Sequence, residues 1–468
     1  MNRFILSYLG IFFILLSVLS FFNIVYSYYF NLYLNINTYF YTFLISGIIG
    51  LSSFIIKKKT IKIDIYSKIF TVILGYFLLP LIISIPFYFS IYNLSFLNCY
   101  FESISGFTST GFTVFENVKH IDQSLIIWRS TSQWVGGLYF LFSILLLIDI
   151  FDRNLKKSLT DYLSFNSSEI FKQSFKIIII YTILTLVIFI FLKIVNLRTF
   201  DAFNIALTLV SSGGFLPANN IDILFQTDIS KLILSLLMLV SFFSLFLIYN
   251  LIFFNKGNSN YLSEDFNLVI YLLIVISFFF IFFNNNNNFL NLLVSITSSV
   301  SNIGISFSNI NSNLYFLFLI LVIIGGSFFS TSSGLRVIKI ISLVKFSINN
   351  LLSHTKPNQV YSTKVSLTDS NTEISDINKY FLSILIFVLS LFLITILLTL
   401  SNIDFYTSFK IGILTIMNTV NSSMYNLNEF DFYNLGFFTK IYLIVFMIIG
   451  RVELLTVLIL FKKFLFKN

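Results

Sequence analysis

Four short stretches rich in Ser, Thr, Gly and Asn interrupt an otherwise apolar chain. They read SISGFTSTGFTVF at 103–115, LVSSGGFLP at 209–217, SSVSNIGISF at 298–307 and IMNTVNSSMY at 416–425. Extended backbone can point successive carbonyl oxygens one way where glycine relaxes the dihedral limits. A ring of such oxygens replaces the water shell of a cation such as potassium. Any one stretch could be a plain loop, but four at equivalent places predict a cation site.

Each stretch follows a half-length amphipathic segment. These segments cover residues 95–107, 199–211, 289–301 and 405–418. A helix needs about 20 residues to cross the hydrocarbon of a bilayer, so these segments are too short to span it. Irregular backbone at membrane depth is tolerated only where it is buried in protein or lines a watery cavity. Half-helices whose negative C-terminal ends point at one axis would favour a cation there.

The composition is typical of a membrane protein. Of the 468 residues, 57% are hydrophobic and 10% are charged, and the mean hydropathy is +0.91. A soluble protein carries about 25% charged residues, so a lipid bilayer must surround most of this surface. The net charge of +9 fits basic residues on the cytoplasmic side, and we expect no nucleic-acid partner. One cysteine and two histidines argue against a Cys- or His-based metal site.

Ten apolar segments are candidates for membrane-crossing helices. They cover 4–26, 38–56, 66–92, 126–150, 174–195, 229–254, 266–283, 313–346, 379–400 and 436–461. The first is too long for a signal peptide and lacks a small-x-small cleavage site, so we expect it to be retained. With a cytoplasmic N-terminus, most Lys and Arg residues lie on the inner side, as the positive-inside rule requires. We therefore expect a multi-pass protein of the inner (cytoplasmic) membrane with both termini cytoplasmic.

The order of span, half-helix, small-polar stretch and span occurs four times after the first two spans. This predicts an all-α integral membrane protein with four pseudo-symmetric helix–pore-helix–helix repeats and two N-terminal transmembrane helices. The expected boundaries are 1–60 for the N-terminal helices, 61–160, 161–260, 261–350 and 379–468 for the pore repeats, and 351–378 for a cytoplasmic linker. The linker is too short to be a nucleotide-binding domain, so any regulatory domain must belong to another chain.

Two apolar segments carry polar residues at membrane depth. Residues 325–334, GGSFFSTSSG, break the segment 313–346, and close helix packing on small residues is the alternative interpretation. Arg451 and Glu453 lie inside the last segment. A charge at the bilayer centre costs about 2.5–3.5 kcal/mol on insertion scales and marks function by default. A local ion pair is the alternative, but residues two apart point to different faces of a helix.

These motifs resemble, in their order, the Trk/Ktr/HKT potassium transporter family, and in particular its TrkH-type membrane subunit. GFTSTGFTVF, followed by WRSTSQWVGG at 128–137, is similar to the first repeat, and DAFNIALTLVSSGGF at 201–215 to the second. IGGSFFSTSSGLRVIK at 324–339 resembles the glycine-rich stretch of the third repeat, and GRVELLT at 450–456 the motif of the fourth. The resemblance covers essentially the whole chain, and the two extra N-terminal spans favour the TrkH type over the shorter Ktr type.

The resemblance implies a potassium filter with one strand from each repeat. The implied filter residues are Ser109, Thr110, Gly111, Ser212, Gly213, Gly214, Asn302, Ile303, Gly304, Thr419, Val420 and Asn421. Glycines of the first three repeats match the filter glycines of the family. Asn421 stands where the family usually has the fourth glycine. Loss of a filter glycine is associated in the family with weaker discrimination against sodium, so the choice of potassium over sodium stays open.

The resemblance also implies a gate below the filter, built from an intramembrane loop and a pore arginine. The implied gate residues are Gly325, Gly326, Ser332, Ser333, Gly334, Lys339 and Arg451. Relatives often have three glycines where this chain has Ser332, Ser333 and Gly334, which implies a stiffer loop, and Lys339 would anchor its cytoplasmic end. A positive charge about 5 Å from a potassium ion costs about 3 kcal/mol at an effective dielectric of 20, so Arg451 would slow conduction.

The expected function is uptake of potassium, or of monovalent cations, without enzymatic activity. Potassium is the transported ion, and we expect no covalently bound cofactor. The family implies a homodimer and a cytoplasmic nucleotide-binding regulatory subunit of the TrkA type. A broken-helix secondary transporter that couples a small solute to sodium or protons is the alternative, and a multi-span enzyme is a second one. The first usually has intramembrane acids and the second a catalytic cluster, and the sequence offers little beyond Glu453.

Overall fold

The computed structural model describes residues 3–55, 65–151, 170–245, 247–248, 262–283, 289–308, 312–355, 374–427, 430–452, 456 and 459. Regular structure in this part of the chain is helical throughout, without a strand. Seven of the described helices are long and apolar enough to cross a membrane. The predicted all-α class is therefore confirmed.

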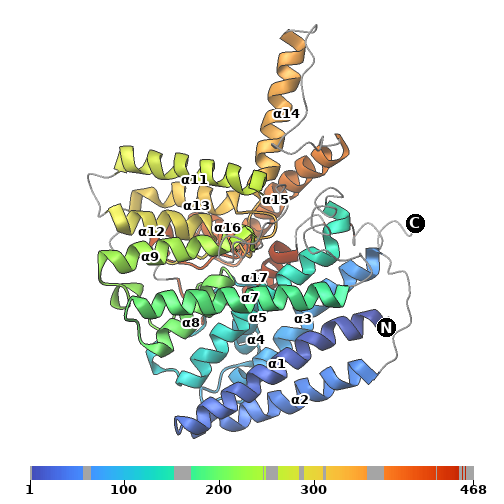
Figure 1. Ribbon diagram of the computed structural model, residues 1–468, viewed down its shortest axis with the longest axis vertical. Coiled ribbons are helices and arrows are strands. Elements are labelled where there is room, and N and C mark those ends of the chain that lie inside the picture. Colours follow the sequence, from blue (N-terminus) through green and yellow to red (C-terminus); the bar gives the residue numbers. More distant parts are fainter. Residues whose placement is uncertain are drawn as a thin grey trace.

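Two long helices, α1 (Arg3–Tyr29) and α2 (Ile36–Ile55), lie side by side at the bottom of Figure 1. A small residue permits their close approach, because a Cβ at Gly50 would lie 2.7 Å from Cγ1 of Ile14. Small residues at contacts are how apolar helices pack in lipid, where the hydrophobic effect gives little drive. α1 also contacts the first and last helices of the next unit, which fixes the pair to the rest of the protein.

Four units of one architecture follow, each with a long helix, a half-helix and a second helix. The units are α3 (Ile65–Tyr88), α4 (Phe96–Phe107) and α5 (Gln123–Phe151); α7 (Ile170–Ile194), α8 (Thr199–Val210) and α9 (Asp228–Met238); α11 (Leu262–Phe283), α12 (Phe289–Val300) and α13 (Tyr315–Ile324); and α15 (Ile374–Leu400), α16 (Phe405–Ile416) and α17 (Phe437–Val452). α5 packs on α8, α9 on α12, α13 on α16 and α17 on α4. The units therefore follow one another around a ring, so the second lies opposite the fourth.

The half-helices match the predicted segments to within two residues at each end, and two of them start at side-chain caps. The side chains of Ser95 and Asp404 accept hydrogen bonds from N–H groups in the first turns of α4 and α16. Such caps satisfy donors that have no partner within the helix. Hydrogen bonds from the Thr407 hydroxyl and backbone N–H lower the pKa of the exposed Asp404 below its ordinary value. The two caps explain why α4 and α16 begin where they do.

Two of the ten predicted spans are not continuous helices. α9 stops at Met238 and passes into one 3₁₀ turn, although the prediction ran to residue 254. The segment 313–346 is divided into α13 and α14 (Val337–Thr355) by the irregular residues 325–336. α17 is described as far as Val452, and Glu453 lies outside the described residues. The break after α9 was not predicted, because the residues there are mostly apolar.

The predicted linker at 351–378 is corrected at both ends. Residues 351–355 form the end of α14, and residues 374–378 form the start of α15. The remaining residues 356–373 lie outside the part of the chain that the structure describes. α14 projects away from the stacked helices in Figure 1. The polar composition of this region did not reveal that helix continues into it from both sides.

Candidate functional site

The four small-polar stretches leave their half-helices with the same backbone geometry. In each, the second residue after the helix is left-handed, and its N–H donates to the carbonyl three residues earlier. These residues are Ser109 (φ 59°), Ser212 (φ 56°), Asn302 (φ 59°) and Asn418 (φ 48°). The next N–H in each stretch donates to the carbonyl five residues earlier. A left-handed residue that closes a helix this way is a common C-terminal cap, and here it turns the chain in the same manner four times.

This register identifies the counterparts of the filter glycines. The residue two positions after the left-handed residue is glycine in the first three repeats, at Gly111, Gly214 and Gly304. In the fourth repeat it is Val420. The family resemblance assigned this position to Asn421, which is one residue later than the position given by the backbone geometry. Because no glycine marks the fourth stretch, only the hydrogen bonds at the end of α16 could set its register.

Side-chain hydrogen bonds join the fourth stretch to both of its neighbours. The Asn302 amide donates to the Thr419 hydroxyl at 3.2 Å, which links the third and fourth stretches. The Asn418 amide donates to the Thr110 hydroxyl at 3.0 Å, which links the fourth and first. All four side chains are fully buried. Residues separated by more than 100 positions in the sequence are thus brought together around one centre.

The second stretch is joined to the third stretch and to α5 of the first repeat. The Ser212 hydroxyl donates to the carbonyl of Ser301 at 2.6 Å. Gln133 on α5 accepts a hydrogen bond from the N–H of Phe215 at 3.2 Å, and its side chain lies beside Gly213. Hydrogen bonds therefore join the second stretch to the third, the third to the fourth and the fourth to the first, whereas the second stretch is bonded to α5 of the first repeat.

A buried ion pair supports the first stretch. Nε of Arg129 lies 2.8 Å from Oε1 of Glu102. The other Glu102 oxygen accepts from the N–H of Val114 at 2.9 Å, and Arg129 donates to the Thr113 hydroxyl at 2.9 Å. The guanidinium also lies 4.2 Å from the ring centroid of Phe215. The pair holds the backbone just beyond the first filter strand, so its role is to position that strand.

In the first and fourth repeats, the C-terminal end of the half-helix packs against the helix that follows it. A Cβ at Gly136 of α5 would lie 1.8 Å from the carbonyl oxygen of Phe107. A Cβ at Gly450 of α17 would lie 2.1 Å from the carbonyl oxygen of Ile416. No side chain fits at either place. These glycines let α5 and α17 lie close to the points where the filter strands begin.

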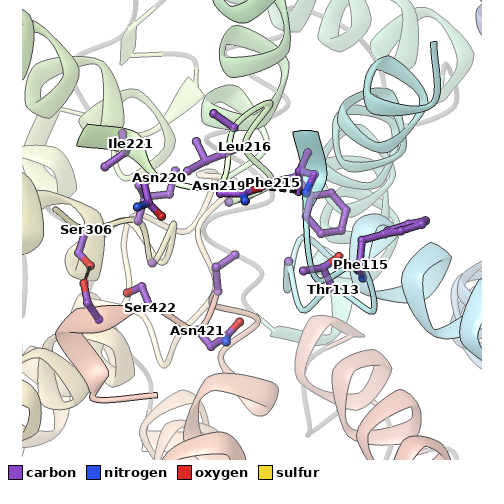
Figure 2. A pocket seen from close by; sticks show the side chains of 18 of the residues that line it. Thr113, Phe115, Phe215, Leu216, Asn219, Asn220, Ile221, Ser306, Asn421 and Ser422 are labelled. Atoms are coloured by element: carbon purple, nitrogen blue, oxygen red, sulfur yellow. Dashed lines mark hydrogen bonds between the residues drawn. The ribbon is translucent and has the colours of Figure 1, made fainter. Parts of the chain in front are cut away.

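A cavity of about 430 Å³ opens beside the four stretches. Its lining includes all four counterparts, Gly111, Gly214, Gly304 and Val420. Figure 2 shows Thr113, Ser306 and Asn421 around it on strands from the first, third and fourth repeats. Glu116 and Asp222 are also among its lining residues. The cavity is a polar vestibule that a hydrated cation could enter before it meets the ring.

The predicted gate loop, residues 325–336 between α13 and α14, is closed on itself. Gly325 and Gly334 have φ of 69° and 95°, and a Cβ at Gly334 would lie 2.5 Å from Cα of Gly325. The Ser332 hydroxyl accepts a hydrogen bond from the N–H of Gly326 at 3.2 Å. The two ends of the loop therefore touch, and residues 325–333 are buried inside the protein.

Arg336, which the sequence analysis did not select, holds this loop together. One of its terminal nitrogens donates to the carbonyls of Ser327 and Ser332 at 2.7 and 2.9 Å, and to the Ser330 hydroxyl at 3.1 Å. Arg336 is only 2% exposed. Lys339, the predicted anchor, lies in the first turn of α14 and donates its N–H to the Arg336 carbonyl. The available signal was a basic residue directly after a small-residue loop at membrane depth.

Arg451 connects the gate loop to the first filter strand. Its guanidinium donates to the Ser333 hydroxyl at 2.6 Å and to the Ser109 hydroxyl at 3.4 Å. Its central carbon lies 4.0 Å from the ring centroid of Phe140, and the side chain is 1% exposed. Among the described residues, no carboxylate forms a salt bridge with it. A buried positive charge therefore sits against the residue that starts the filter strand.

The unpredicted break after α9 is matched to the gate loop. The carbonyl of Phe242 accepts from the N–H of Ser327 at 2.9 Å, and the carbonyl of Ser241 accepts from the N–H of Ser332 at 3.1 Å. Backbone groups without helical partners must be satisfied inside the protein at membrane depth. The break after α9 and the gate loop therefore supply hydrogen-bond partners to each other. The third-repeat loop is thus held by the second repeat as well as by Arg336.

Comparisons with known proteins agree with this architecture. The chain is 25% identical over 94% of its length, and 91% of the other, to an uncharacterized cation transporter of Methanocaldococcus jannaschii. It is 24% identical to the Trk system potassium uptake protein TrkG of Escherichia coli over 92% of both chains, and 24% identical to TrkH of the same organism over 81% of both. No family model matches the chain.

The crystal structure of the potassium transporter TrkH from Vibrio parahaemolyticus has the same fold. The two superpose with a TM-score of 0.84, at 20% sequence identity and over 98% of both chains. The long apolar helices and these membrane-transport relatives establish a multi-pass membrane protein. The chain therefore has the fold of TrkH and is similar over most of its length to the TrkH and TrkG potassium uptake proteins.

Proposed function

We propose that this chain takes up potassium across the cytoplasmic membrane through a pore formed by its four repeats. The observation that carries the proposal is the shared register: four left-handed turns at the ends of four half-helices direct four strands to one centre. Carbonyl oxygens of such strands can replace the hydration shell of a potassium ion. The names of the TrkH and TrkG relatives, which are potassium uptake proteins, support potassium as the ion.

The proposed filter consists of the residues that follow the four turns. These are Ser109, Thr110, Gly111, Ser212, Gly213, Gly214, Asn302, Ile303, Gly304, Asn418, Thr419 and Val420. In this register Asn421 follows the proposed filter residues and lines the vestibule. None of these side chains is charged, so the backbone carbonyls are the ligands that a cation would meet.

The proposed gate is the loop 325–336 together with Arg451. Arg451 bridges Ser333 and Ser109, so its charge lies between the loop and the filter strand. A charge about 5 Å from the ion costs about 3 kcal/mol at an effective dielectric of 20. Opening therefore requires Arg451 to move or the loop to rearrange. Arg451→Ala is expected to raise potassium flux at least about tenfold, a change of about 1.4 kcal/mol in the barrier; unchanged flux would contradict the electrostatic barrier.

The proposed assembly is a homodimer in the inner membrane with both termini in the cytoplasm and a TrkA-type nucleotide-binding regulatory subunit. The gene products related to this chain carry Trk system names, which supports a multi-component system. α14 projects from the bundle next to the gate loop. A helix in that position would give a cytoplasmic partner a direct connection to the gate.

The experiment that tests the function is uptake of potassium against sodium by the purified full-length protein in proteoliposomes. Potassium uptake driven by a potassium gradient, with sodium uptake weaker, is the expected result. Equal flux of both ions would identify a less selective cation pathway. The absence of flux of either ion, in wild type and in Arg451→Ala, would favour a solute transporter over a pore.

A further inference from the structure

The side chain of Val420 occupies the centre of the filter ring. A Cβ built on Gly111 would lie 2.0 Å from Cγ2 of Val420, and a Cβ built on Gly214 would lie 2.2 Å from the same methyl group. This methyl therefore lies in van der Waals contact with the backbones of the first and second strands. Both glycines also line the vestibule, as does Val420.

The order of repeats gives this contact its meaning. The second repeat lies opposite the fourth, because α17 packs on α4 and α13 on α16, which makes the first and third repeats the neighbours of the fourth. A side chain of the fourth strand that touches Gly214 has therefore crossed the ring. Backbone atoms of Val420 lie beside Gly304 on the third side, at 2.5 and 2.8 Å from a Cβ built there. Val420 thus meets the other three strands at the level of the filter glycines.

The volume of this side chain opposes the passage of a cation. An isopropyl group in contact with the strands on the other sides of the ring takes up the space through which a cation would have to pass. The first three repeats have glycine at this level and leave the centre free. The fourth repeat alone fills the centre.

We propose that Val420 is a steric barrier inside the filter, which closes the ion pathway in this conformation and sets the transport rate in series with the loop and Arg451. This proposal rests on the proposed function, since it assigns a rate-determining residue to the same pathway. Conduction requires the isopropyl group to be displaced from the ring centre. The size of the side chain at position 420 should then control flux, whereas its polarity should matter little.

The test measures potassium and sodium uptake in proteoliposomes for Val420→Gly, Val420→Ala and Val420→Thr, each in the Arg451→Ala background so that the inner barrier does not mask the outer one. Thr has nearly the volume of Val but carries a hydroxyl. We expect flux to rise at least about tenfold for Gly, equivalent to about 1.4 kcal/mol in the barrier, less for Ala, and to stay near the background for Thr. Potassium preference over sodium is expected to increase for Gly, because four equivalent strands then face the ion.

Two further variants control for stability and for register. Val72→Ala removes the same atoms from a buried valine on α3, far along the chain from the ring, and is expected to leave flux at the background. Asn421→Gly deletes the neighbouring side chain that the sequence alignment favoured. A large increase for Asn421→Gly without one for Val420→Gly would overturn the assignment of Val420. Size-exclusion profiles of all variants identify any that fail to fold.

The outcomes separate this proposal from the proposed function. If Arg451→Ala carries potassium and Val420→Gly adds nothing, the pathway exists but Val420 is no barrier. If Val420→Thr conducts as well as Val420→Gly, the barrier is the lack of a ligand and the steric proposal is wrong. If no folded variant, Arg451→Ala included, carries either ion, the pore function itself fails.

Discussion

The first and fourth filter strands begin with the same turn and differ two residues later. Both leave a half-helix through a left-handed residue, Ser109 or Asn418, with matching backbone hydrogen bonds. Two residues later the first strand has Gly111, and the fourth has Val420. The turn at the start of a strand is therefore set by how its half-helix ends and does not need this glycine. At Gly111 the glycine leaves space in the ring and also adopts a φ of 77°, which Val420 does not.

The two strands also differ in how they are supported. Glu102 lies nine residues before Gly111 and pairs with Arg129, whereas Ile411 lies nine residues before Val420. Ile411 is fully buried and apolar, so the fourth strand has no ionic support at the matching place. It depends on hydrogen bonds from Asn418 instead. Breaking each support in turn shows how far the two strands are interchangeable.

The largest effect is expected from the ionic support of the first strand. Glu102→Ala removes one partner of a buried ion pair and leaves Arg129 uncompensated, which typically costs about 3–5 kcal/mol. We expect a strong fall in thermal stability in detergent and loss of potassium flux. The matched control is Ile411→Ala in the fourth repeat, which removes apolar contacts but no charge. Equal thermal shifts for the two variants would contradict the special role of the ion pair.

An intermediate effect is expected where the two strands meet. Gly111→Ala adds a Cβ at a φ of 77°, 2.0 Å from Val420 Cγ2, and strained positions of this kind cost about 1–3 kcal/mol. We expect potassium flux to fall by about tenfold or more.

Combining this change with Val420→Gly is the sharper measurement. The second substitution removes the clash but not the unfavourable φ, so partial recovery of flux is expected. Full recovery would mean that strain at Gly111 is negligible, and no recovery would mean that the two side chains do not compete for one space.

The smallest effect is expected from the polar support of the fourth strand. Asn418 donates to Thr110 at 3.0 Å and to the carbonyl of Met447 at 2.9 Å. A typical hydrogen bond contributes about 0.5–1.5 kcal/mol, so Asn418→Ala is expected to lower stability by about 1–3 kcal/mol. Thermal unfolding followed by fluorescence provides the measurement. The preference for potassium over sodium can also be expressed as a free energy. If Asn418→Ala lowers this free energy by more than it lowers the free energy of unfolding, the bond shapes the filter itself.

Sequence patterns predicted the parts of this protein that depend on local chemistry. Most long helices appear where apolar runs predicted them, and the half-helices match the predicted segments to within two residues. The buried charge at Arg451 was visible because a cation at membrane depth is expensive. The all-α class followed from the apolar runs and is confirmed, and the similarity to TrkH-type proteins, which the order of the motifs had indicated, is found again in the comparisons.

The break after α9 could not be predicted, because its residues are apolar and its cause lies elsewhere. Phe242 and Ser241 leave the helix to bond with a loop nearly 90 residues away. Arg336 was similarly overlooked, since its partners at Ser327 and Ser332 are carbonyls that no sequence pattern reveals.

By itself, the sequence determined the four-repeat plan, the membrane environment and the four small-polar stretches, because hydrophobic length and glycine content act over a few residues. Only the tertiary structure decided that Val420, and not Asn421, faces Gly111 and Gly214 across the ring. Register depends on hydrogen bonds at the end of α16, and contact across the ring depends on the packing of all four repeats. Both the register and the contact therefore depend on residues that lie far from Val420 in the sequence.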